Sequence, residues 1–580
     1  MSFMKNDEIA KILYEIAEYL AMDDVAFKPQ AYEKAAVIID DLEVEIEEIY
    51  KKEGLKGLEK IPTIGKGIAK VIEELLKTGK TKEHERLKKK TPVKLSELTA
   101  VEGVGPKIIK KLYQELKVRN LNDLEKAAKA GKIRNLEDFG EKTEQNILRG
   151  IEFLRRSNNR FALGFIMPVV RKIEARIKNL PGVKNAIVAG SIRRMKETIG
   201  DGDILATVSS KKDADKIMDF FVKMPEVIHI YSKGVTRSSV RLKNNMDFDL
   251  RVVPEKSFGA ALQYFTGSKD HNIALRKIAI EKNYKLNEYG VWKKGKTVAG
   301  KTEEEIYKVL GLKMMEPELR EDKGEIEASL NDNLPDLIGY NDLNGDLQIQ
   351  TNWSDGSSSI EEYAQEAMRL GLKYIAITDH TISLAIANGL DEKRLAQQGR
   401  EIDRINLKLK AQNSKFKILK SAEVNILKDG RLDINDETLK KLDIVAIAVH
   451  SGFKMSKKEM TERIIKAMKN PNIDILFHPT GRIINSRPPY EIDIEKIIRA
   501  AKETKTVLEI NAHPSRLDLK DEYARMAKEV GVKLEISSDA HNTNYFQFLE
   551  FGIAQARRGW VEKKDIINAW PVEKMLKMLK

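Results

Sequence analysis

Several features that many proteins rely on are missing from this 580-residue sequence. It contains no cysteine, which excludes disulfides, thiolate metal sites and zinc fingers. Any metal must therefore bind aspartate, glutamate or one of the eight histidines. No run of about 18 apolar residues could span a membrane, and the N-terminal stretch carries acids where a signal peptide is first basic and then apolar. We expect a soluble, cytoplasmic protein without a membrane partner.

Positive charge is in excess, with a net charge of +13 at pH 7. Residues 336–580 carry only about +3 of it, so roughly +10 lies on the first 335 residues. Such an excess favours polyanionic partners such as nucleic acids. A solubility surface rich in lysine and glutamate explains the charge equally well, so charge alone does not decide the partner.

The pattern of apolar residues changes along the chain, and its length predicts several domains. Short amphipathic helices are predicted over 1–155, strands separated by helices over 156–255, and a mixed segment over 256–315. A polar stretch at 314–342 lacks periodicity and is typical of a linker. From Leu347 onward, apolar strand-like runs alternate with helices, a pattern typical of a barrel or a doubly wound sheet.

A short form recurs in the N-terminal segment. The stretches IPTIGKGIAKVIEELLKTG (61–79), LTAVEGVGPKIIKKLYQEL (98–116) and LEDFGEKTEQNILRGIE (136–152) each place a glycine turn before a helix. Such turns present backbone N–H groups and a helix N-terminus to a phosphate without reading bases. The repeat therefore predicts helix-hairpin-helix binding of DNA through Gly65, Gly67, Gly103, Gly105 and Lys107.

The stretch AGSIRRMKETIGDGDILATVSS combines a phosphate-binding turn with paired acids. Gly190 and Ser191 follow a strand and can meet a phosphate through an N–H and a hydroxyl. Arg193 and Arg194 come next, and the arginine fork suits phosphate oxygens.

Two acids then stand at the start of a strand. Asp201 and Asp203 are spaced i and i+2, so both carboxylates lie on one face and can bind a pair of Mg²⁺ ions. A third acid is expected from the neighbouring strand MDFDLRVVP, which offers Asp247 and Asp249 on the same face.

This stretch resembles the palm of the family X DNA polymerases, and the segment YFTGSKDHN, which begins at Tyr264, resembles their nucleotide seat. The resemblance implies that Asp201, Asp203 and Asp249 are catalytic and hold Mg²⁺ or Mn²⁺. The nucleotide-binding residues that it implies are Gly190, Ser191, Arg194, Arg160, Tyr264, Phe265, Gly267, Asn272 and Arg276.

The first hairpin region resembles the small lyase domain of some family members. Its alignment puts Val71 at the position of the nucleophilic lysine and Gly67 at that of a supporting lysine. Val71 cannot attack a carbonyl carbon, and Lys70 points about 100° away around the helix. We therefore do not predict a 5′-deoxyribose phosphate lyase activity.

Acids and histidines recur near strand ends in the C-terminal half. They are Asp355, His380, Glu423, His450, His478, Asp539 and His541. Ligands that gather at the C-terminal ends of barrel strands are typical of a metallo-phosphoesterase.

This half resembles a polymerase and histidinol phosphatase (PHP) domain, a distorted (β/α)₇ barrel implied to degrade DNA 3′ to 5′ with Mn²⁺. Mn²⁺ or Zn²⁺ is expected in its metal site, with reduced occupancy. The family site begins with His-x-His, and here Gln348 and Gln350 replace both histidines; Asn425 stands where an aspartate is common. An amide oxygen is a weaker ligand than imidazole for a transition metal. We expect the first metal to be weakly held, the remaining ligands to hold others, and the nuclease to be strongly reduced.

The sequence as a whole predicts a multidomain α/β DNA polymerase that fills short gaps in DNA repair. The expected domains are a helical 8-kDa-like domain (1–95), a fingers-like domain (96–155), a nucleotidyltransferase palm (156–255), a thumb (256–315), a linker (316–340) and the PHP barrel (341–580). The expected partners are gapped or primer-template DNA and deoxynucleoside triphosphates, bound by a monomer. A repair nuclease centred on the barrel and a non-enzymatic DNA-bridging module are the alternatives.

Overall fold

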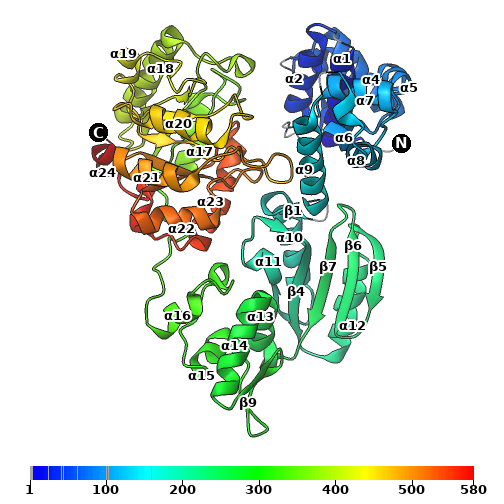
Figure 1. Cartoon of the computed structure of the whole chain (residues 1–580). Helices are drawn as coiled ribbons and strands as arrows, with labels where there is room; N and C mark the ends of the chain where they lie inside the picture. Colours follow the sequence, from blue (N-terminus) through cyan, green and yellow to red (C-terminus); the bar gives the residue numbers. More distant parts are fainter. Residues whose placement is uncertain are drawn as a thin grey trace. The chain divides into compact units, whose positions relative to one another are not determined.

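The chain forms two compact units, residues 1–158 and 159–580, in the computed structural model shown in Figure 1. The structure describes residues 4–579 apart from Asp24, Asp41, Glu43, Val44, Pro62, Ala100, Glu102, Gly103, Asp138, Asn158 and Asn159. The side chains of Asp7 and of residues 152–157 also lie outside this description. Gly103, a predicted DNA-binding residue, is therefore outside the described residues. Among those described, no helix has the length and apolar character needed to cross a bilayer.

The first unit is helical, as the sequence predicts. Its elements are α1 (Asn6–Met22), α2 (Lys28–Asp40), α3 (Ile46–Glu59), α4 (Lys66–Thr78), α5 (Lys82–Lys90), α6 (Leu95–Thr99), α7 (Pro106–Leu116), α8 (Leu121–Lys129), the 3₁₀ turn η1 (Ile133–Asn135) and α9 (Glu141–Ser157). Helix α4 shows why these segments fold: Ile68, Ile72 and Leu75 form one buried stripe, and Gly79 ends the helix with a left-handed residue.

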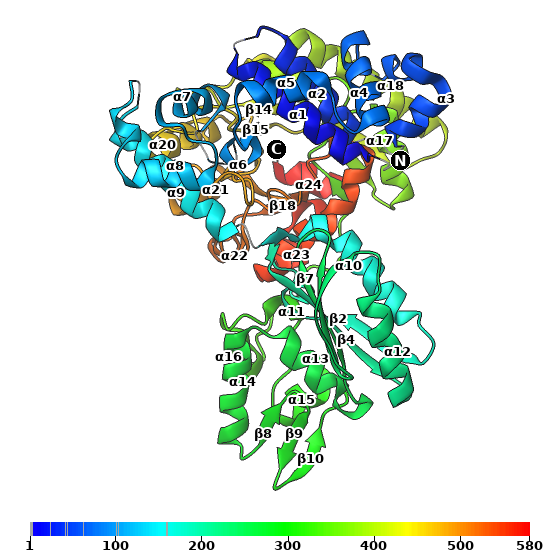
Figure 2. The ribbon, with the colours of Figure 1, turned by 90° about the vertical axis from the view of Figure 1, so that its right-hand side faces the viewer.

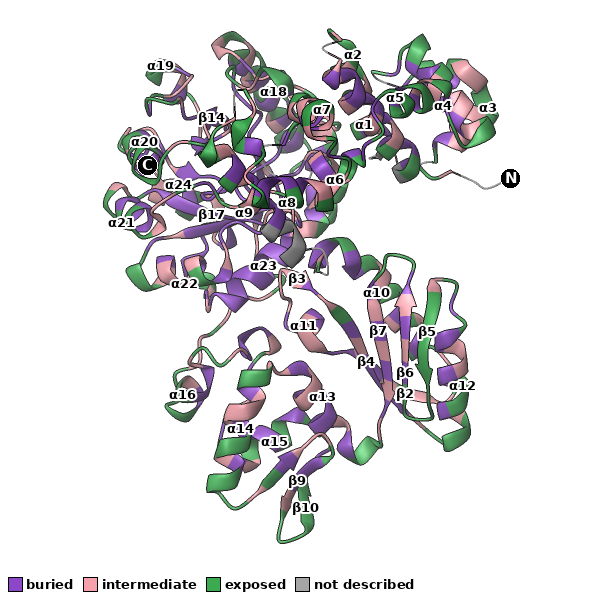
Figure 3. Cartoon of the chain, turned by 45° about the vertical axis from the view of Figure 1, so that its right-hand side comes forward, coloured by how far each residue is buried: buried purple, intermediate pink, exposed green. Residues whose placement is uncertain are grey.

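The second unit begins with a palm built on a five-stranded sheet in the order β2-β4-β7-β6-β5. Its elements are β1 (Phe161–Ala162), α10 (Leu163–Lys178), β2 (Val183–Val188), α11 (Gly190–Arg193), β3 (Thr198–Ile199), β4 (Asp201–Val208), α12 (Lys211–Val222), β5 (Val227–Lys233), β6 (Arg237–Leu242) and β7 (Asp247–Val252). Figure 2 shows α10 and α12 along one face of this sheet. The edge strand β5 is largely exposed (Figure 3), whereas β4 is buried along most of its length.

A smaller α/β region follows the palm. Its elements are η2 (Glu255–Ser257), α13 (Phe258–Thr266), α14 (Lys269–Glu281), β8 (Lys285–Asn287), β9 (Gly290–Lys293), β10 (Lys296–Ala299), α15 (Glu303–Val309), η3 (Pro317–Leu319) and α16 (Glu325–Leu330). Residues 316–340, expected as a linker, are partly helical and contribute the fully buried side chains of Arg320 and Glu325. These charged side chains can be buried because they are paired: Arg320 bonds to Glu303, and Glu325 accepts from His271 at 2.7 Å. The polar composition alone does not predict this packing.

The C-terminal part alternates parallel strands with helices. Its strands are β11 (Gly345–Asp346), β12 (Tyr374–Ile377), β13 (Lys417–Lys420), β14 (Glu423–Asn425), β15 (Ala446–Ala448), β16 (Ile475–Leu476), β17 (Val507–Asn511) and β18 (Leu534–Ser537). Its helices are α17 (Ile360–Arg369), η4 (Ala385–Ala387), α18 (Glu392–Ala411), α19 (Asp436–Leu439), α20 (Lys457–Met468), α21 (Ile494–Thr504), α22 (Asp521–Val530), η5 (Thr543–Phe548), α23 (Leu549–Arg558), η6 (Lys563–Asp565), η7 (Ile567–Ala569) and α24 (Val572–Leu579).

These strands form two parallel sheets that are linked at both edges. The sheets are β11-β12-β13 and β14-β15-β16-β17-β18. Parallel bridges join His380 to Glu423 and Ile349 to Ala540, and β13 and β14 are separated by two residues only. If β13 and β14 are counted as one interrupted segment, the eight strands make seven segments linked by these bridges. The distorted barrel stays a prediction, and residues 341–580 are called the barrel for brevity.

The palm and the barrel share one hydrophobic core within the second unit. Leu517 and Phe551 of the barrel are buried in the same cluster as the palm residues. Gly164 of α10 makes this approach feasible, because a Cβ there would stand 2.5 Å from Pro514. Two ion pairs add to the contact: Arg482–Glu197 at 2.7 Å and Arg171–Glu550 at 2.6 Å.

Candidate functional site

The predicted catalytic acids lie at the starts of two adjacent parallel strands, β4 and β7 (Figure 1). The register pairs Asp201 with Asp247 and Asp203 with Asp249. Because side chains alternate along each strand, all four carboxylates are expected on one face of the sheet, as the sequence predicts. The choice between Asp247 and Asp249 as the third acid therefore depends on their surroundings.

Electrostatics and hydrogen bonds distinguish Asp249 from Asp247. Burial, together with the charges of Asp201 and Asp249, raises the pKa of Asp203 to about 6. Asp247 is not among the main charges that act on Asp203, and Arg241 holds it in a bidentate pair at 2.8 and 2.9 Å. Asp201, Asp203 and Asp249 therefore form one group of neighbouring carboxylates, whose repulsion at Asp203 the charges of Arg237 and Arg251 offset only in part.

Two arginines stand beside the third acid. Arg237 of β6 donates to the Asp249 carboxylate at 2.7 Å, and Arg251 lies 3.5 Å from the same oxygen. Sequence analysis did not single out Arg237, because its approach to Asp249 depends on the antiparallel pairing of β6 with β7. These contacts fix the orientation of Asp249.

The predicted phosphate-binding turn faces the acids. Gly190 has a φ of +65°, which favours glycine, and a Cβ there would lie 3.1 Å from an Asp203 carboxylate oxygen. Ser191 follows in the short helix α11 and is partly exposed. A backbone N–H, a hydroxyl and the carboxylate group are therefore neighbours.

The two predicted triphosphate arginines are already engaged. Arg194 is 9% exposed, pairs with Glu321 at 2.9 Å and donates to the Thr266 carbonyl at 2.6 Å. Arg160 is exposed, and its side chain donates to Thr198 at 2.8 Å. Each would need to change partners to bind a phosphate.

The predicted nucleotide seat is a compact turn between α13 and α14. The rings of Tyr264 and Phe265 meet edge to face, with centroids 5.1 Å apart. Asn272 donates to the Tyr264 carbonyl at 2.7 Å, and its side chain also lies against Gly267. Arg276 is exposed on the next turn of α14. The structure thus brings these residues together, with Asn272 shaping the turn.

In the first unit, two predicted DNA-binding turns begin helices. Gly65 precedes α4 and Gly105 precedes α7, each as an extended N-cap residue. A Cβ at Gly65, Gly67 or Gly105 would meet nothing within 4 Å. Lys107 is exposed in the first turn of α7. These turns leave open space in front of the helix N-termini, as backbone binding of a phosphate requires.

In the barrel, Glu423 is the centre of the predicted metal residues. Its carboxylate lies 2.9 Å from His478 and 3.0 Å from His450, and 3.4 Å from His380. Burial alone would raise the pKa of Glu423, but His380 and His450 hold it well below its usual range. The carboxylate is therefore charged and surrounded by imidazoles.

Both glutamines point at this same carboxylate, which agrees with their predicted common face. Gln350 donates its amide to Glu423 at 2.8 Å and Gln348 does so at 3.2 Å; both side chains are fully buried. The Gln350 amide oxygen and the Nδ1 atoms of His380 and His478 are buried without a hydrogen-bond partner. Buried acceptors of this kind suit coordination of a cation.

Two groups of barrel side chains have donor atoms within 4.8 Å of one another, close enough to share an ion. One is Asp355, His380 and His541; the other is His380, Glu423 and His450. Imidazole nitrogens with carboxylates suit Mn²⁺ or Zn²⁺. The residues that remain therefore fit a metal, although Gln348 and Gln350 contribute only amides.

Asp539 is placed differently from the other predicted ligands. It pairs with Arg516 at 3.2 Å and accepts from Asn511 at 3.1 Å, and Asn511 also donates to Gln348 at 3.0 Å. Asp539 and His478 have positive φ angles of 55° and 28°, a strain that is common at functional sites. Sequence analysis missed Asn511 and Arg516 because no spacing marks them.

Four protein-family models match segments of the chain. A helix-hairpin-helix domain matches residues 4–81 and a SAM-like helix-hairpin-helix tandem matches 95–152. The DNA polymerase beta thumb matches 261–321, which extends beyond the expected end of the thumb at 315. The PHP domain matches 346–513.

Whole-chain and partial relatives agree with these matches. A Bacillus subtilis protein named DNA polymerase/3′-5′ exonuclease PolX is 37% identical over 572 residues, which is 98% of each chain. A probable phosphatase of Thermoanaerobacter sp. strain X514 is 39% identical over 195 residues, 32% of this chain and 73% of its own. A probable phosphatase of Acetivibrio thermocellus is 34% identical over 193 residues with the same coverage.

Proposed function

Because this chain belongs to the family X DNA polymerases of the PolX type, with a PHP domain, we propose that it fills short gaps during DNA repair. It is a DNA polymerase, and its substrates are DNA and deoxynucleoside triphosphates. We infer that it acts as a monomer in the cytoplasm on gapped or primer-template DNA. The exposed glycine turns of the first unit would grip phosphates, which makes binding depend on salt.

We assign nucleotidyl transfer to Asp201, Asp203 and Asp249. The observation that carries this assignment is the raised pKa of Asp203, caused by burial and by the two neighbouring carboxylates. A site that repels its own negative charge fits a hard divalent cation, Mg²⁺ or Mn²⁺. When bound, such ions would activate the primer 3′-hydroxyl and stabilise the pyrophosphate leaving group.

The remaining palm residues would position the nucleotide. Gly190 and Ser191 would donate to the triphosphate beside Asp203, and Arg194 would exchange Glu321 for a phosphate oxygen. The edge-to-face pair of Tyr264 and Phe265 would form the seat for the sugar. The remaining assigned residues, Arg160, Gly267, Asn272 and Arg276, complete the set that the family resemblance implies.

We propose that the barrel has weak nuclease activity and supports the palm. The two glutamine amides donate to Glu423 where imidazole lone pairs would otherwise face a metal. The shared core through Leu517 and Phe551 supports a scaffold role, since the barrel completes the hydrophobic interior of the palm. Mn²⁺ or Zn²⁺ would bind the remaining barrel ligands with reduced affinity.

The experiment that tests this function uses a labelled primer in a short gapped duplex, incubated with Mg²⁺ or Mn²⁺. Elongation is expected with nucleotides, and an intact primer without them. An Asp201→Ala variant should lose elongation and keep DNA binding. Elongation by that variant would contradict the assignment of the palm acids, and loss of DNA binding would instead indicate a folding defect.

A 3′-5′ exonuclease in the barrel is the second candidate activity. It is favoured by the intact group of Asp355, His380 and His541. Shortening of the primer in Mn²⁺ without nucleotides, abolished by His380→Ala, would establish it.

A further inference from the structure

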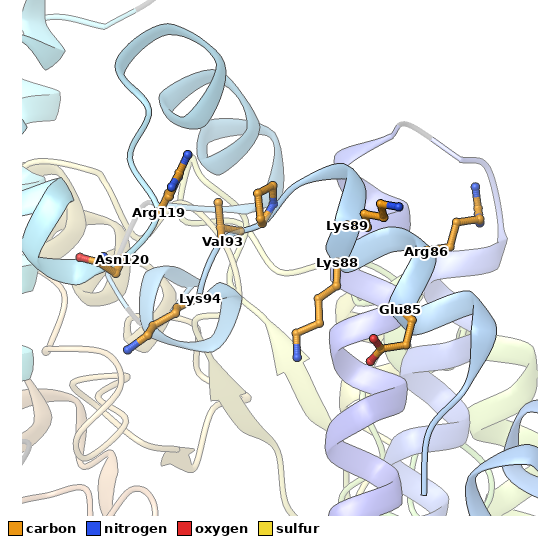
Figure 4. Close-up of a pocket in the computed structure, with 9 residues that line it drawn as sticks. Glu85, Arg86, Lys88, Lys89, Val93, Lys94, Arg119 and Asn120 are labelled. Atoms are coloured by element: carbon orange, nitrogen blue, oxygen red, sulfur yellow. The ribbon is translucent and has the colours of Figure 1, made fainter. Parts of the chain in front are cut away.

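The helical unit contains a pocket whose described lining includes none of the predicted glycine-turn residues. Its volume is about 740 Å³, and it lies between α5 and the segment that joins α7 to α8 (Figure 4). Its lining residues are Glu85, Arg86, Lys88, Lys89, Pro92, Val93, Lys94, Arg119 and Asn120. All of them lie within residues 1–158, so the pocket belongs to this unit alone.

The lining is strongly basic, because it contains five cationic side chains and one acid, Glu85. Arg86 is paired with Glu83 at 3.0 Å and Lys94 with Glu97 at 2.8 Å. Within the described part of the chain, the other three cations, which are Lys88, Lys89 and Arg119, form no salt bridge. The charge of Lys88 also acts on Glu15, so the positive charge is partly neutralised. The lining still carries more positive than negative charge, which attracts an anion.

The two walls of the pocket are fixed by backbone contacts. The N–H of Lys94 donates to the Arg119 carbonyl at 2.7 Å, which holds the start of α6 beside the start of α8. The Arg119 N–H donates to Asp123 at 3.1 Å, and the Asn120 side chain accepts from the Asp123 N–H at 2.9 Å. These caps leave the Arg119 side chain available while its backbone is held.

The chemistry of the lining indicates which part of a nucleic acid it suits. Its only apolar members are Pro92 and Val93, and no aromatic ring lines it. Binding of bases in single strands relies on aromatic stacking, whereas the sugar-phosphate backbone is bound by lysine and arginine. A volume in the range of ligand pockets accommodates more than a single ion.

From this geometry we propose that the pocket binds a phosphodiester segment of the DNA substrate and is a second backbone site, distinct from the glycine turns. The inference rests on the proposed function only in taking DNA as the ligand. Contacts with phosphates alone make the site independent of sequence. It would hold the strand at the connection between the two helix-hairpin-helix segments.

The test compares the wild-type chain with a triple variant, Lys88→Ala, Lys89→Ala and Arg119→Ala. The matched control removes three exposed lysines outside the pocket: Lys52→Ala, Lys126→Ala and Lys132→Ala. Both variants lose the same charge. Binding of a fluorescent gapped duplex is measured by anisotropy between 50 and 200 mM NaCl.

Each lost phosphate contact lowers the slope of log K against log salt by about 0.9, so three contacts lower it by about 2.7. When NaCl rises fourfold, the affinity of each protein for DNA falls by some factor. That factor should be roughly 40 times smaller for the pocket variant than for the wild type. The control variant should keep nearly the wild-type slope. Equal slopes for the two variants would overturn the proposal, because the effect would then be general electrostatics.

A second readout locates the contact. Acetylation of Lys88 and Lys89, followed by mass spectrometry, should slow at least fivefold when the gapped duplex is bound. Protection by a polyglutamate peptide without protection by DNA would indicate an acidic protein partner and refute the proposal. Neither readout requires nucleotide addition, so failure of the polymerase assay and failure of this site remain distinguishable.

Discussion

Imidazoles introduced at positions 348 and 350 should strengthen the proposed metal-dependent nuclease activity. The perturbation is the double variant Gln348→His and Gln350→His. Both glutamines are fully buried and both donate to one carboxylate, that of Glu423. Replacing each amide donor by an imidazole nitrogen turns two groups that compete with a cation for Glu423 into two ligands for that cation.

The magnitude follows from the number of ligands gained. Even the outer hydrogen-bond partners of metal ligands are worth about 10–100-fold in affinity, so two direct ligands should raise Mn²⁺ affinity by at least about 100-fold. An ion present at about 100 times its dissociation constant stabilises the fold by about 2.7 kcal/mol. For a domain of this size, that corresponds to a rise in Tm of roughly 5–10 °C.

The assay is thermal unfolding with and without Mn²⁺, combined with shortening of a labelled primer in the absence of nucleotides. The double variant should show both a large Mn²⁺ shift and primer shortening, and the wild type should show little of either. The matched control places histidines at two exposed glutamines of the same barrel, Gln397→His and Gln412→His. This control should behave like the wild type.

Two results would refute the reasoning. An equally large Mn²⁺ shift in the wild type would mean that the remaining ligands already hold the full set of ions. A double variant that stays folded without gaining a Mn²⁺ shift would mean that the glutamines do not occupy ligand positions.

Three further predictions concern the palm. Asp249→Asn should abolish elongation, whereas Asp247→Asn should retain most of it; equal losses would contradict the distinction drawn from the charge of Asp249 at Asp203. Arg558 of α23 donates to the Arg194 carbonyl at 3.0 Å and pairs with Glu321 at 3.1 Å. Arg558→Gln should therefore raise the KM for nucleotides several-fold with little change in kcat. An unchanged KM would exclude a role of Arg558 in positioning Arg194. In EDTA, Asp203→Asn should raise the Tm at pH 7.5 but not at pH 4. The pKa of Asp203 in the folded chain is about 6, above the ordinary value of 3.8. Ionisation of this carboxyl therefore destabilises the folded chain as the pH rises from about 4 to above 6. A Tm gain of equal size at both pH values would disprove this origin.

Local patterns in the sequence were sufficient to predict the elements that hold the proposed site residues. The i, i+2 spacing of Asp201 and Asp203 and the alternation of Gln348 and Gln350 each predicted a common face, because strand side chains alternate regardless of tertiary context. In the structure both glutamines meet the same carboxylate, which is the arrangement this periodicity required.

Contacts between distant segments could not be predicted in this way. The pairing of Arg194 with Glu321 joins residues 127 positions apart, and that of Arg237 with Asp249 depends on strand order. The polar stretch after residue 315 has the composition of a linker. The sequence shows that Arg320 is charged, but it does not show that Glu303 lies beside Arg320 and neutralises this charge. Composition therefore predicted exposure where pairing permits burial.

The shared core of palm and barrel has a consequence for how this chain can change over generations. A substitution at a buried polar position of the barrel need not disturb the fold, since side chains such as Gln348 and Gln350 fill the interior and satisfy Glu423. Deletion of the whole barrel would uncover the apolar residues that Leu517 and Phe551 now cover, and would endanger the polymerase itself. We therefore expect substitutions to be tolerated at the predicted metal residues and opposed in the shared core, so that the proposed nuclease activity would be lost before the C-terminal domain.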